Sequence, residues 1–208
     1  GGVIWEEYRG RIGATRFIAA NKAYAVPEGV PDLFKTLYSP APYLETVNTE
    51  ALELTLFQVS DRNLIRAVQN GWLGAPMPDY AAETFTTEMG QQVWQGPADV
   101  GMEVNLDITT RLPLDAALKD RPAGIYALRA TVPGVDPYVI PAAWQWFVVS
   151  DLGLTTLSGV DGLHVFALGL GDAQPKAGVA VQLVSRANAV LGEAVTDDRG
   201  HAVFAAGL

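Results

Sequence analysis

Alternating apolar and polar residues recur along much of the chain, and this pattern predicts strands more often than helices. Leu52, Leu54 and Leu56 alternate with polar neighbours, which is the period of two expected of a half-buried strand. The alternation slips at Leu56 and Phe57, so we expect a β-bulge there. Residues 103–109 alternate in the same way, with valine, leucine and isoleucine on one face, and predict another half-buried strand.

Two segments further along predict strands of different kinds. Residues 125–132 follow the turn-forming sequence Pro122-Ala123-Gly124 and alternate along their length. Residues 144–149 are apolar on both faces, as expected of a central strand in a β-sandwich.

Beyond Ser150 the predicted strands become shorter and follow one another closely. Glycine, proline and aspartate residues separate five candidates, at 152–157, 163–168, 179–185, 190–196 and 202–205. Short strands at regular spacing with such turns are typical of a β-sandwich. An immunoglobulin-like sandwich has about seven strands, so we expect missing strands or an unpaired edge at the C-terminal end.

Helical patterns are few. Residues 61–70 begin with Asp61, a good N-cap residue, and end before Gly71, so they predict a short helix. Residues 114–119 lie between two prolines and predict one or two helical turns. Residues 71–90 contain proline and glycine and show little periodicity, so we expect a long loop there.

The change of pattern near residues 149–152 predicts a domain boundary with little linker. We therefore expect an all-β fold of tandem antiparallel β-sandwich domains, immunoglobulin-like or fibronectin-III-like. The first would span residues 12–150 and the second residues 151–208, the second being incomplete.

The composition fits a folded, acidic module. The chain has 208 residues, of which 49% are hydrophobic, and a formal charge of −9. An acidic chain without clustered Lys and Arg excludes nucleic acid as a natural partner. The absence of cysteine excludes disulfides, thiolate metal sites and a cysteine nucleophile within these residues. No apolar run reaches the ~18–20 residues of a membrane span. The chain starts with Gly1-Gly2 and ends at Leu208, and we therefore expect a fragment of a longer protein.

The known motifs of catalysis are missing, and the remaining candidates favour structural roles. Residues 169–174 begin like a dinucleotide fingerprint but lack the third glycine and a following helix, so they predict a loop between strands. His164 and His201 are expected to be ordinary strand residues. Residues 197–200, Asp-Asp-Arg-Gly, predict a hairpin turn rather than a calcium loop.

Two further groups of side chains are candidates for sites. The adjacent carboxylates of Glu6 and Glu7 would point to opposite faces of a strand. Trp144 and Trp146 share one face of a strand, which favours a core or interdomain contact over a stacking platform for carbohydrate or peptide. Trp72 and Trp94 flank the irregular segment and are the better candidates for exposed contacts with a neighbouring domain.

We therefore assign no catalytic, cofactor-binding or metal residue, expect no cofactor, and do not expect an enzyme.

Three stretches of sequence resemble one family. They are TVNTEALELTLFQVSDRNL at 46–64, QWFVVSDLGLTTLSGVDGLHVF at 145–166, and PKAGVAVQLVSRANAVLGEAVTDDRGHAVF at 175–204. Each is similar to a segment of the N-terminal macroglobulin-like domains of bacterial alpha-2-macroglobulins. The second stretch is the most specific, because it resembles the junction between two such domains, whereas the TDxxG half of the third recurs in other bacterial modules.

The resemblance implies a scaffold part of a broad-spectrum endopeptidase inhibitor that traps proteases after they cut a bait segment. Its partners would be other domains of the same polypeptide and, through the full-length protein, proteases. It also implies a periplasmic, cell-envelope or extracellular location, reached through a lipoprotein signal outside these residues. No residue here matches the family's Cys–Gln thioester motif, because the chain has no cysteine, and no bait segment can be assigned.

Two other functions fit the same patterns. The chain could be an immunoglobulin-like adhesion or ligand-binding module of a surface protein, which the TDxxG turns and aromatic residues allow. It could also be an accessory domain of a secreted enzyme, although no motif supports this function.

Overall fold

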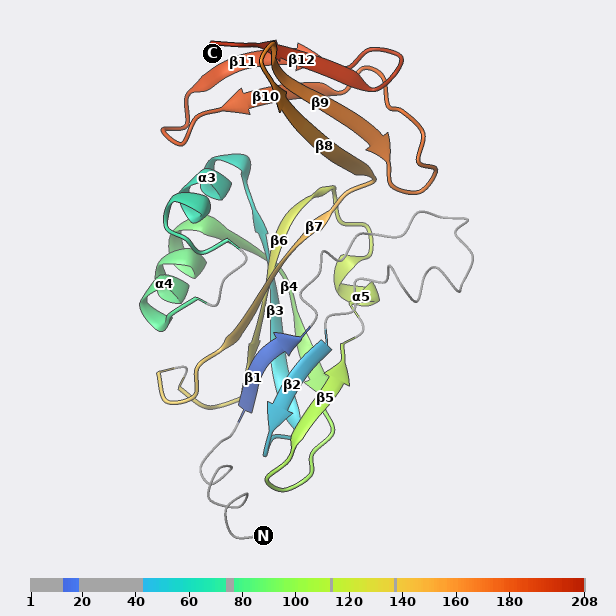
Figure 1. Cartoon of the computed structure of the whole chain (residues 1–208). Coiled ribbons are helices and arrows are strands. Elements are labelled where there is room, and N and C mark those ends of the chain that lie inside the picture. The colour runs from blue at the N-terminus through green and yellow to red at the C-terminus, as the bar shows by residue number, and fades with distance from the viewer. Residues whose placement is uncertain (1–12, 19–42, 74–76, 113, 137, 208) are drawn as a thin grey trace. The chain divides into compact units, whose positions relative to one another are not determined.

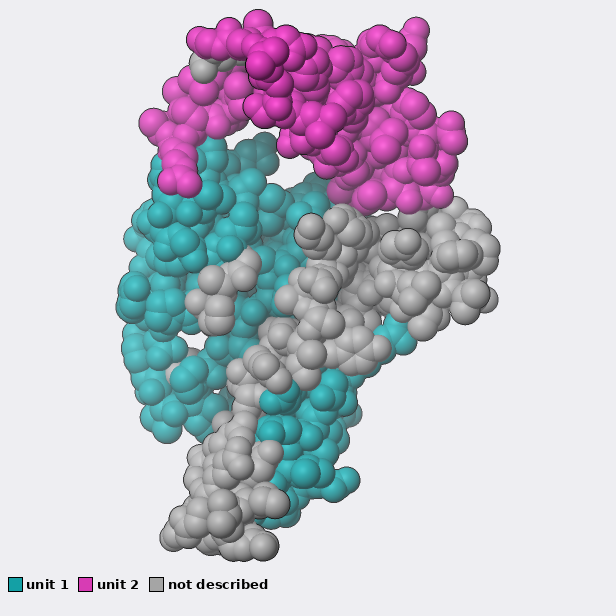
Figure 2. Space-filling model, viewed as in Figure 1, with its two compact units in different colours: residues 1–24, 39–149 teal, residues 25–38, 150–208 magenta. Residues whose placement is uncertain are grey.

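The computed structural model describes residues 13–18, 43–73, 77–112, 114–136 and 138–207. The chain divides into two compact units (Figure 2), and the described residues of the first end at Val149 while those of the second begin at Ser150. The division into domains at 12–150 and 151–208 stays a prediction, as does the incompleteness of the second. None of the helices in the described ranges is long and apolar enough to cross a membrane.

The described residues of unit 1 form two antiparallel sheets (Figure 1). The larger has the order β4-β3-β6-β7, formed by β3 (Ala51–Val59), β4 (Gly90–Asp99), β6 (Gly124–Thr131) and β7 (Ala143–Val149). The smaller has the order β1-β2-β5, formed by β1 (Gly13–Ile18), β2 (Tyr43–Val47) and β5 (Asp107–Arg111).

The register of the larger sheet separates its two faces. Phe57 pairs with Ala127, which pairs with Trp146, so these three side chains share one face. Leu56 and Leu128 pair on the opposite face, where both are fully buried. The pairing of β3 with β4 shifts between Leu56 and Phe57, which confirms the predicted bulge.

Helices cover the Phe57 face of the sheet. They are α3 (Asp61–Gln69), α4 (Asp79–Thr84) and the π-helical turn η1 (Phe85–Met89), and Figure 1 shows α3 and α4 together on one side. Helix α3 confirms the prediction for 61–70, and α5 (Asp115–Leu118) confirms the short helix predicted at 114–119. The core under these helices is formed by Phe57, Val59, Ala67, Met77, Ala81, Phe85, Met89, Ala127, Trp144 and Trp146.

The prediction of a long loop at 71–90 is wrong. Pro78 occupies the N-cap of α4, and Ala81, Phe85 and Met89 recur every four residues and are buried. This spacing places the three side chains on one helical face, which packs on the sheet. Gly90 then begins β4.

Two other strand predictions need correction. Residues 103–106 form a turn rather than a strand, because Asn105 has a φ of 58° and its backbone N–H donates to Asn48 Oδ1 at 2.7 Å. Strand β5 starts only at Asp107. Strand β7 is not central but lies at the edge of its four-stranded sheet, and its burial on both faces comes from the helices on one side and β1 on the other.

A buried tyrosine fixes the start of β6. The Tyr126 hydroxyl donates to the Pro122 carbonyl oxygen at 2.7 Å, and its ring stacks on Phe147 with centroids 5.9 Å apart. Burial raises the pKa of Tyr126, and the nearby Arg121 opposes this shift. The arrangement resembles the tyrosine corner of β-sandwiches, in which a strand-entry tyrosine bonds the backbone upstream.

The described part of unit 2 contains five antiparallel strands, which confirms the five predicted after Ser150. They are β8 (Leu152–Gly159), β9 (Gly162–Gly169), β10 (Ala180–Val184), β11 (Val190–Val195) and β12 (His201–Ala205). Two sheets result, with the orders β12-β9-β8 and β10-β11. The buried apolar side chains of the described part of unit 2 are Val165, Ala167, Ala202 and Phe204.

Candidate functional site

The tryptophan pair on β7 is part of the core. Trp144 and Trp146 point to the helical side, and both are at least nine-tenths buried. The Phe85 ring stands edge-on to both, with centroids 5.4 and 5.3 Å away. The core interpretation is therefore confirmed, and these rings are not available as a stacking platform.

Trp72 and Trp94 are half-buried rather than exposed. Trp72 packs against the same core. The Trp94 ring folds over Gly96, so that a side chain at that glycine would collide with it. Contact of either residue with a neighbouring domain stays a prediction.

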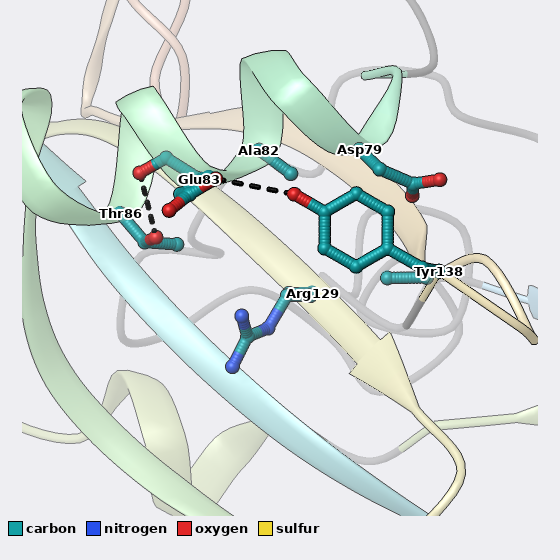
Figure 3. A pocket seen from close by; sticks show the side chains of 7 residues that line it. Asp79, Ala82, Glu83, Thr86, Arg129 and Tyr138 are labelled. Carbon is teal, nitrogen blue, oxygen red and sulfur yellow. Dashed lines mark hydrogen bonds between the residues drawn. The ribbon is translucent and has the colours of Figure 1, made fainter. Parts of the chain in front are cut away.

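A pocket of about 200 Å³ opens between helix α4 and strand β6 (Figure 3). Helix α4 and the turn η1 contribute one wall, strand β6 contributes Arg129, and the segment before β7 closes the side. The lining residues are Asp79, Ala82, Glu83, Thr86, Arg129, Tyr138 and Ala142.

Arg129 is the only cation among these lining residues. Its guanidinium carbon lies 5.6 Å from the centre of the Phe57 ring and 5.9 Å from that of Trp144, within the range of cation–π attraction. Its Nε is buried and has no hydrogen-bond partner among the described residues. Burial lowers the pKa of Arg129, and the charge of Glu53 opposes the shift.

The carboxylate of Glu83 lies on the side of the pocket opposite Arg129. It accepts a hydrogen bond from the Tyr138 hydroxyl at 3.1 Å (Figure 3). This bond is the main cause that raises the pKa of Tyr138, and the charges of Glu83, Asp79 and Asp136 add to it. Tyr138 is otherwise exposed, so the bond forms the rim of the pocket rather than its floor.

The two histidines lie side by side in unit 2. His164 Nδ1 is 3.0 Å from His201 Nε2, and His164 Nε2 is 3.0 Å from Asp161 Oδ2. The His201 ring also stacks on Phe166, with centroids 4.6 Å apart. The hydrogen bond from His164 is the main cause that lowers the pKa of Asp161. Both are strand residues, as expected, but the sequence did not reveal that they meet.

The two glycine-bearing segments are connections between strands. Asp197 Oδ1 accepts from the backbone N–H groups of Arg199 and His201, both at 2.9 Å, and this closes the turn between β11 and β12. Residues 169–174 join β9 toward β10, and Gly169 N–H donates to the Gln174 carbonyl at 2.8 Å.

No set of three or more histidine, aspartate or glutamate side chains is placed to hold a metal ion within the described ranges. Glu6 and Glu7 lie outside them. The assignment of no catalytic, cofactor or metal residue stays a prediction.

The pocket was missed by sequence reasoning. One signal was present, because Arg129 is the one charged residue in the predicted strand 125–132. Its meaning depends on α4 and η1, which lie in the segment that the sequence predicts as a loop.

Comparison with protein families gives two matches. The model described as the bacterial alpha-2-macroglobulin MG3 domain matches residues 149–208. The model of phage major capsid protein E matches residues 1–63. The second range includes β2 and β3, which pair into the same sheets as β4 to β7, so we draw no function from it. No curated protein sequence matches the chain.

Solved structures of bacterial alpha-2-macroglobulins share the fold. Native Escherichia coli alpha-2-macroglobulin spanning domains NIE–MG1 matches with a TM-score of 0.64 and 19% identity, over 93% of this chain and 88% of that one. The MG0–NIE–MG1 structure matches with a TM-score of 0.62 and 19% identity, over 92% of this chain and 56% of that one. A Salmonella alpha-2-macroglobulin mutant matches with a TM-score of 0.59 and 17% identity, over 94% of this chain and 10% of that one.

The chain thus spans about half of the MG0–NIE–MG1 structure and a tenth of the Salmonella protein. The predicted all-β fold of antiparallel macroglobulin-type sandwiches is confirmed. The resemblance to the bacterial alpha-2-macroglobulin family is confirmed as well, because residues 149–208 match a domain of that family and nearly the whole chain has a fold found in its members.

Proposed function

We propose that this chain is a scaffold part of a bacterial alpha-2-macroglobulin, a broad-spectrum inhibitor that traps endopeptidases after they cleave a bait segment. The match of residues 149–208 to the MG3 domain carries this proposal. In it the chain contributes structure, and the bait and reactive chemistry belong to other parts of the polypeptide.

The backbone of the chain suits a scaffold that works beside active proteases. Every strand of the described part is paired antiparallel, and paired, buried backbone is a poor substrate, because nicking concentrates at exposed loops. The fully buried rows of β3 and β6 in unit 1 support the same role, since local opening is rare where side chains are closely packed.

Unit 2 offers apolar surface to other domains of the same polypeptide. Leu154 and Leu157 on β8 and Val195 on β11 are each more than half exposed. Leu154 and Leu157 lie on opposite faces of β8, and Val195 lies in the other sheet, so apolar side chains are exposed at more than one place on this unit, and exposed apolar patches are typical of interaction sites. We propose that neighbouring domains cover these side chains, and that proteases are partners only through the full-length protein.

A trap of this kind acts where foreign proteases are met. We therefore propose a periplasmic, cell-envelope or extracellular location, reached through a lipoprotein signal outside these residues.

The proposal is tested with the full-length protein and several unrelated proteases. We expect limited cleavage, retention of the protease on a sizing column, and loss of activity against large substrates. The 208-residue chain alone is the matched control and should neither cleave nor inhibit. If the full-length protein leaves every protease unbound and fully active on large substrates, the trapping function is wrong.

The adhesion alternative gains no support from the two tryptophans that were its candidates. It needs exposed rings for a ligand, and Trp72 and Trp94 are half-buried within unit 1.

A further inference from the structure

Three hydrogen-bond donors form a row across unit 1. Thr55 on β3 pairs directly with Arg129 on β6, and Arg129 pairs directly with Trp144 on β7. Directly paired residues of antiparallel strands point to the same face. The row therefore lies on the helical side of the sheet, below α4 and η1.

All three donors lack partners. Thr55 Oγ1, Arg129 Nε and Trp144 Nε1 are buried and make no hydrogen bond to any described residue. Arginine and tryptophan side chains can only donate. Most buried polar groups in native proteins are satisfied, so this row is unusual, but the three atoms themselves are enclosed by protein and present no surface to the pocket.

Arg129 is the member of this row that lines the pocket. Its guanidinium is held by two aromatic rings rather than by a carboxylate, and no ion pair with a described acidic side chain is formed. A guanidinium in this position is pre-organised for a planar oxyanion, since its N–H groups match carboxylate geometry.

The size and charge of the pocket narrow the ligand. A volume of about 200 Å³ is below the ~300–1,000 Å³ of drug-sized sites, so it suits one side chain or a small molecule. Ala82 and Ala142 provide apolar walls, while Asp79 and Glu83 place negative charge at the rim. A singly charged carboxylate meets less repulsion there than a doubly charged phosphate.

We propose that this pocket binds one carboxylate group on an apolar body, with Arg129 as its ionic partner. The carboxylate would come either from a free small carboxylic acid or from an acidic side chain of a neighbouring polypeptide. This binding is independent of protease trapping, because it needs only unit 1.

The first experiment titrates the 208-residue chain with benzoate and, separately, with the neutral analogue benzyl alcohol. We expect benzoate to shift the amide resonances of Thr86, Arg129 and Tyr138 in a saturable way, and benzyl alcohol to bind at least about tenfold more weakly, because a charged hydrogen bond is lost. Equal binding of the two probes, or no binding of benzoate, overturns the proposal without any variant.

Variants then locate the site. Arg129→Gln should weaken benzoate binding by about ten- to a hundredfold, whereas Arg62→Gln on the exposed side of α3 is the matched control and should leave it unchanged. Glu83→Gln should strengthen binding, because a negative charge at the rim is removed. Arg129→Lys serves if the glutamine variant does not fold, and unchanged affinity in either Arg129 variant overturns the proposal.

A last experiment distinguishes between the two possible sources of the carboxylate. Capped peptides with a central glutamate or glutamine are compared with benzoate on the same resonances. Tighter binding of the glutamate peptide assigns an acidic side chain as the natural occupant, and tighter binding of benzoate assigns a free acid. Failure of both probes overturns carboxylate binding and leaves the proposed trapping function untouched.

Discussion

Phe85 is the side chain whose loss should damage unit 1 most. It is 0% exposed, and its ring stands edge-on to Phe57, Trp144 and Trp146 at centroid distances of 5.6, 5.4 and 5.3 Å. Truncation of a buried phenylalanine to alanine costs about 3–5 kcal/mol, and each aromatic pair adds about 0.5–1.5 kcal/mol beyond buried area. We therefore expect Phe85→Ala to cost about 4–5 kcal/mol of unfolding free energy, near the top of that range.

The assay is guanidinium chloride unfolding followed by tryptophan fluorescence. The four described tryptophans lie in unit 1, so the signal reports this unit. The expected result is a lower midpoint at an unchanged slope. Tyr80→Ala is the matched control, because Tyr80 lies on α4 but is 70% exposed, and it should change stability by less than about 0.5 kcal/mol.

A loss below about 1 kcal/mol for Phe85→Ala would mean that the site collapses without a cavity or that η1 does not pack as described. A loss equal to that of Tyr80→Ala would refute the reasoning outright.

Three further predictions concern single contacts. Tyr126→Phe keeps the stack on Phe147 but removes the hydrogen bond to Pro122; it should cost about 1–2 kcal/mol in the same fluorescence assay, and no change would contradict the corner interaction. Gly162→Ala should abolish the pairing of β9 with β12, because a Cβ there would overlap the Phe204 carbonyl oxygen. In the control Gly178→Ala the new Cβ meets no atom, and the variant should cost only about 1 kcal/mol for its positive φ. Amide exchange of β12 measures the difference between the two variants, and similar exchange in both would count against the described register. The pKa of Asp161 is lowered in the folded protein, so its bond to His164 stabilises unit 2 fully above the ordinary carboxyl pKa of about 3.9, and this stabilisation is lost as the pH falls through the lowered folded pKa. Asp161→Asn should remove this acid dependence from the free energy of unfolding of unit 2, measured between pH 2 and 6. An unchanged pH profile would show that the bond does not form.

The strands were predictable where the local pattern and the sheet agree. The five strands of unit 2 were found because each is bounded by glycine, proline or aspartate, and the bulge at Leu56 and Phe57 was visible as a slip of one residue. The helix in 79–89 was hidden by Pro76, Pro78 and the β-branched Thr84, Thr86 and Thr87. Its four-residue spacing of buried side chains could have been read, but tertiary burial rather than propensity decides such a short helix.

The position of β7 and the pocket depend on contacts that a linear pattern does not contain. The apolar pattern of β7 predicts a central strand, but β7 is an edge strand whose two apolar faces are covered by helices and by β1, which are distant in sequence. Arg129 was visible as a charge in an apolar strand, yet its orphaned Nε depends on which acidic side chains fail to reach it.

The sparse core of unit 2 makes its stability depend on the effective concentration of the neighbouring domains that we propose to cover it. Within the described part of this unit, four apolar side chains are buried, while Leu154, Leu157, Val190 and Val195 are 53–64% exposed. A neighbour that binds these side chains only in the folded form stabilises unit 2 by mass action, by about 2.7 kcal/mol when its effective concentration is a hundred times its dissociation constant. The melting temperature of unit 2 is then set as much by the tether that holds this neighbour close as by the sequence of unit 2.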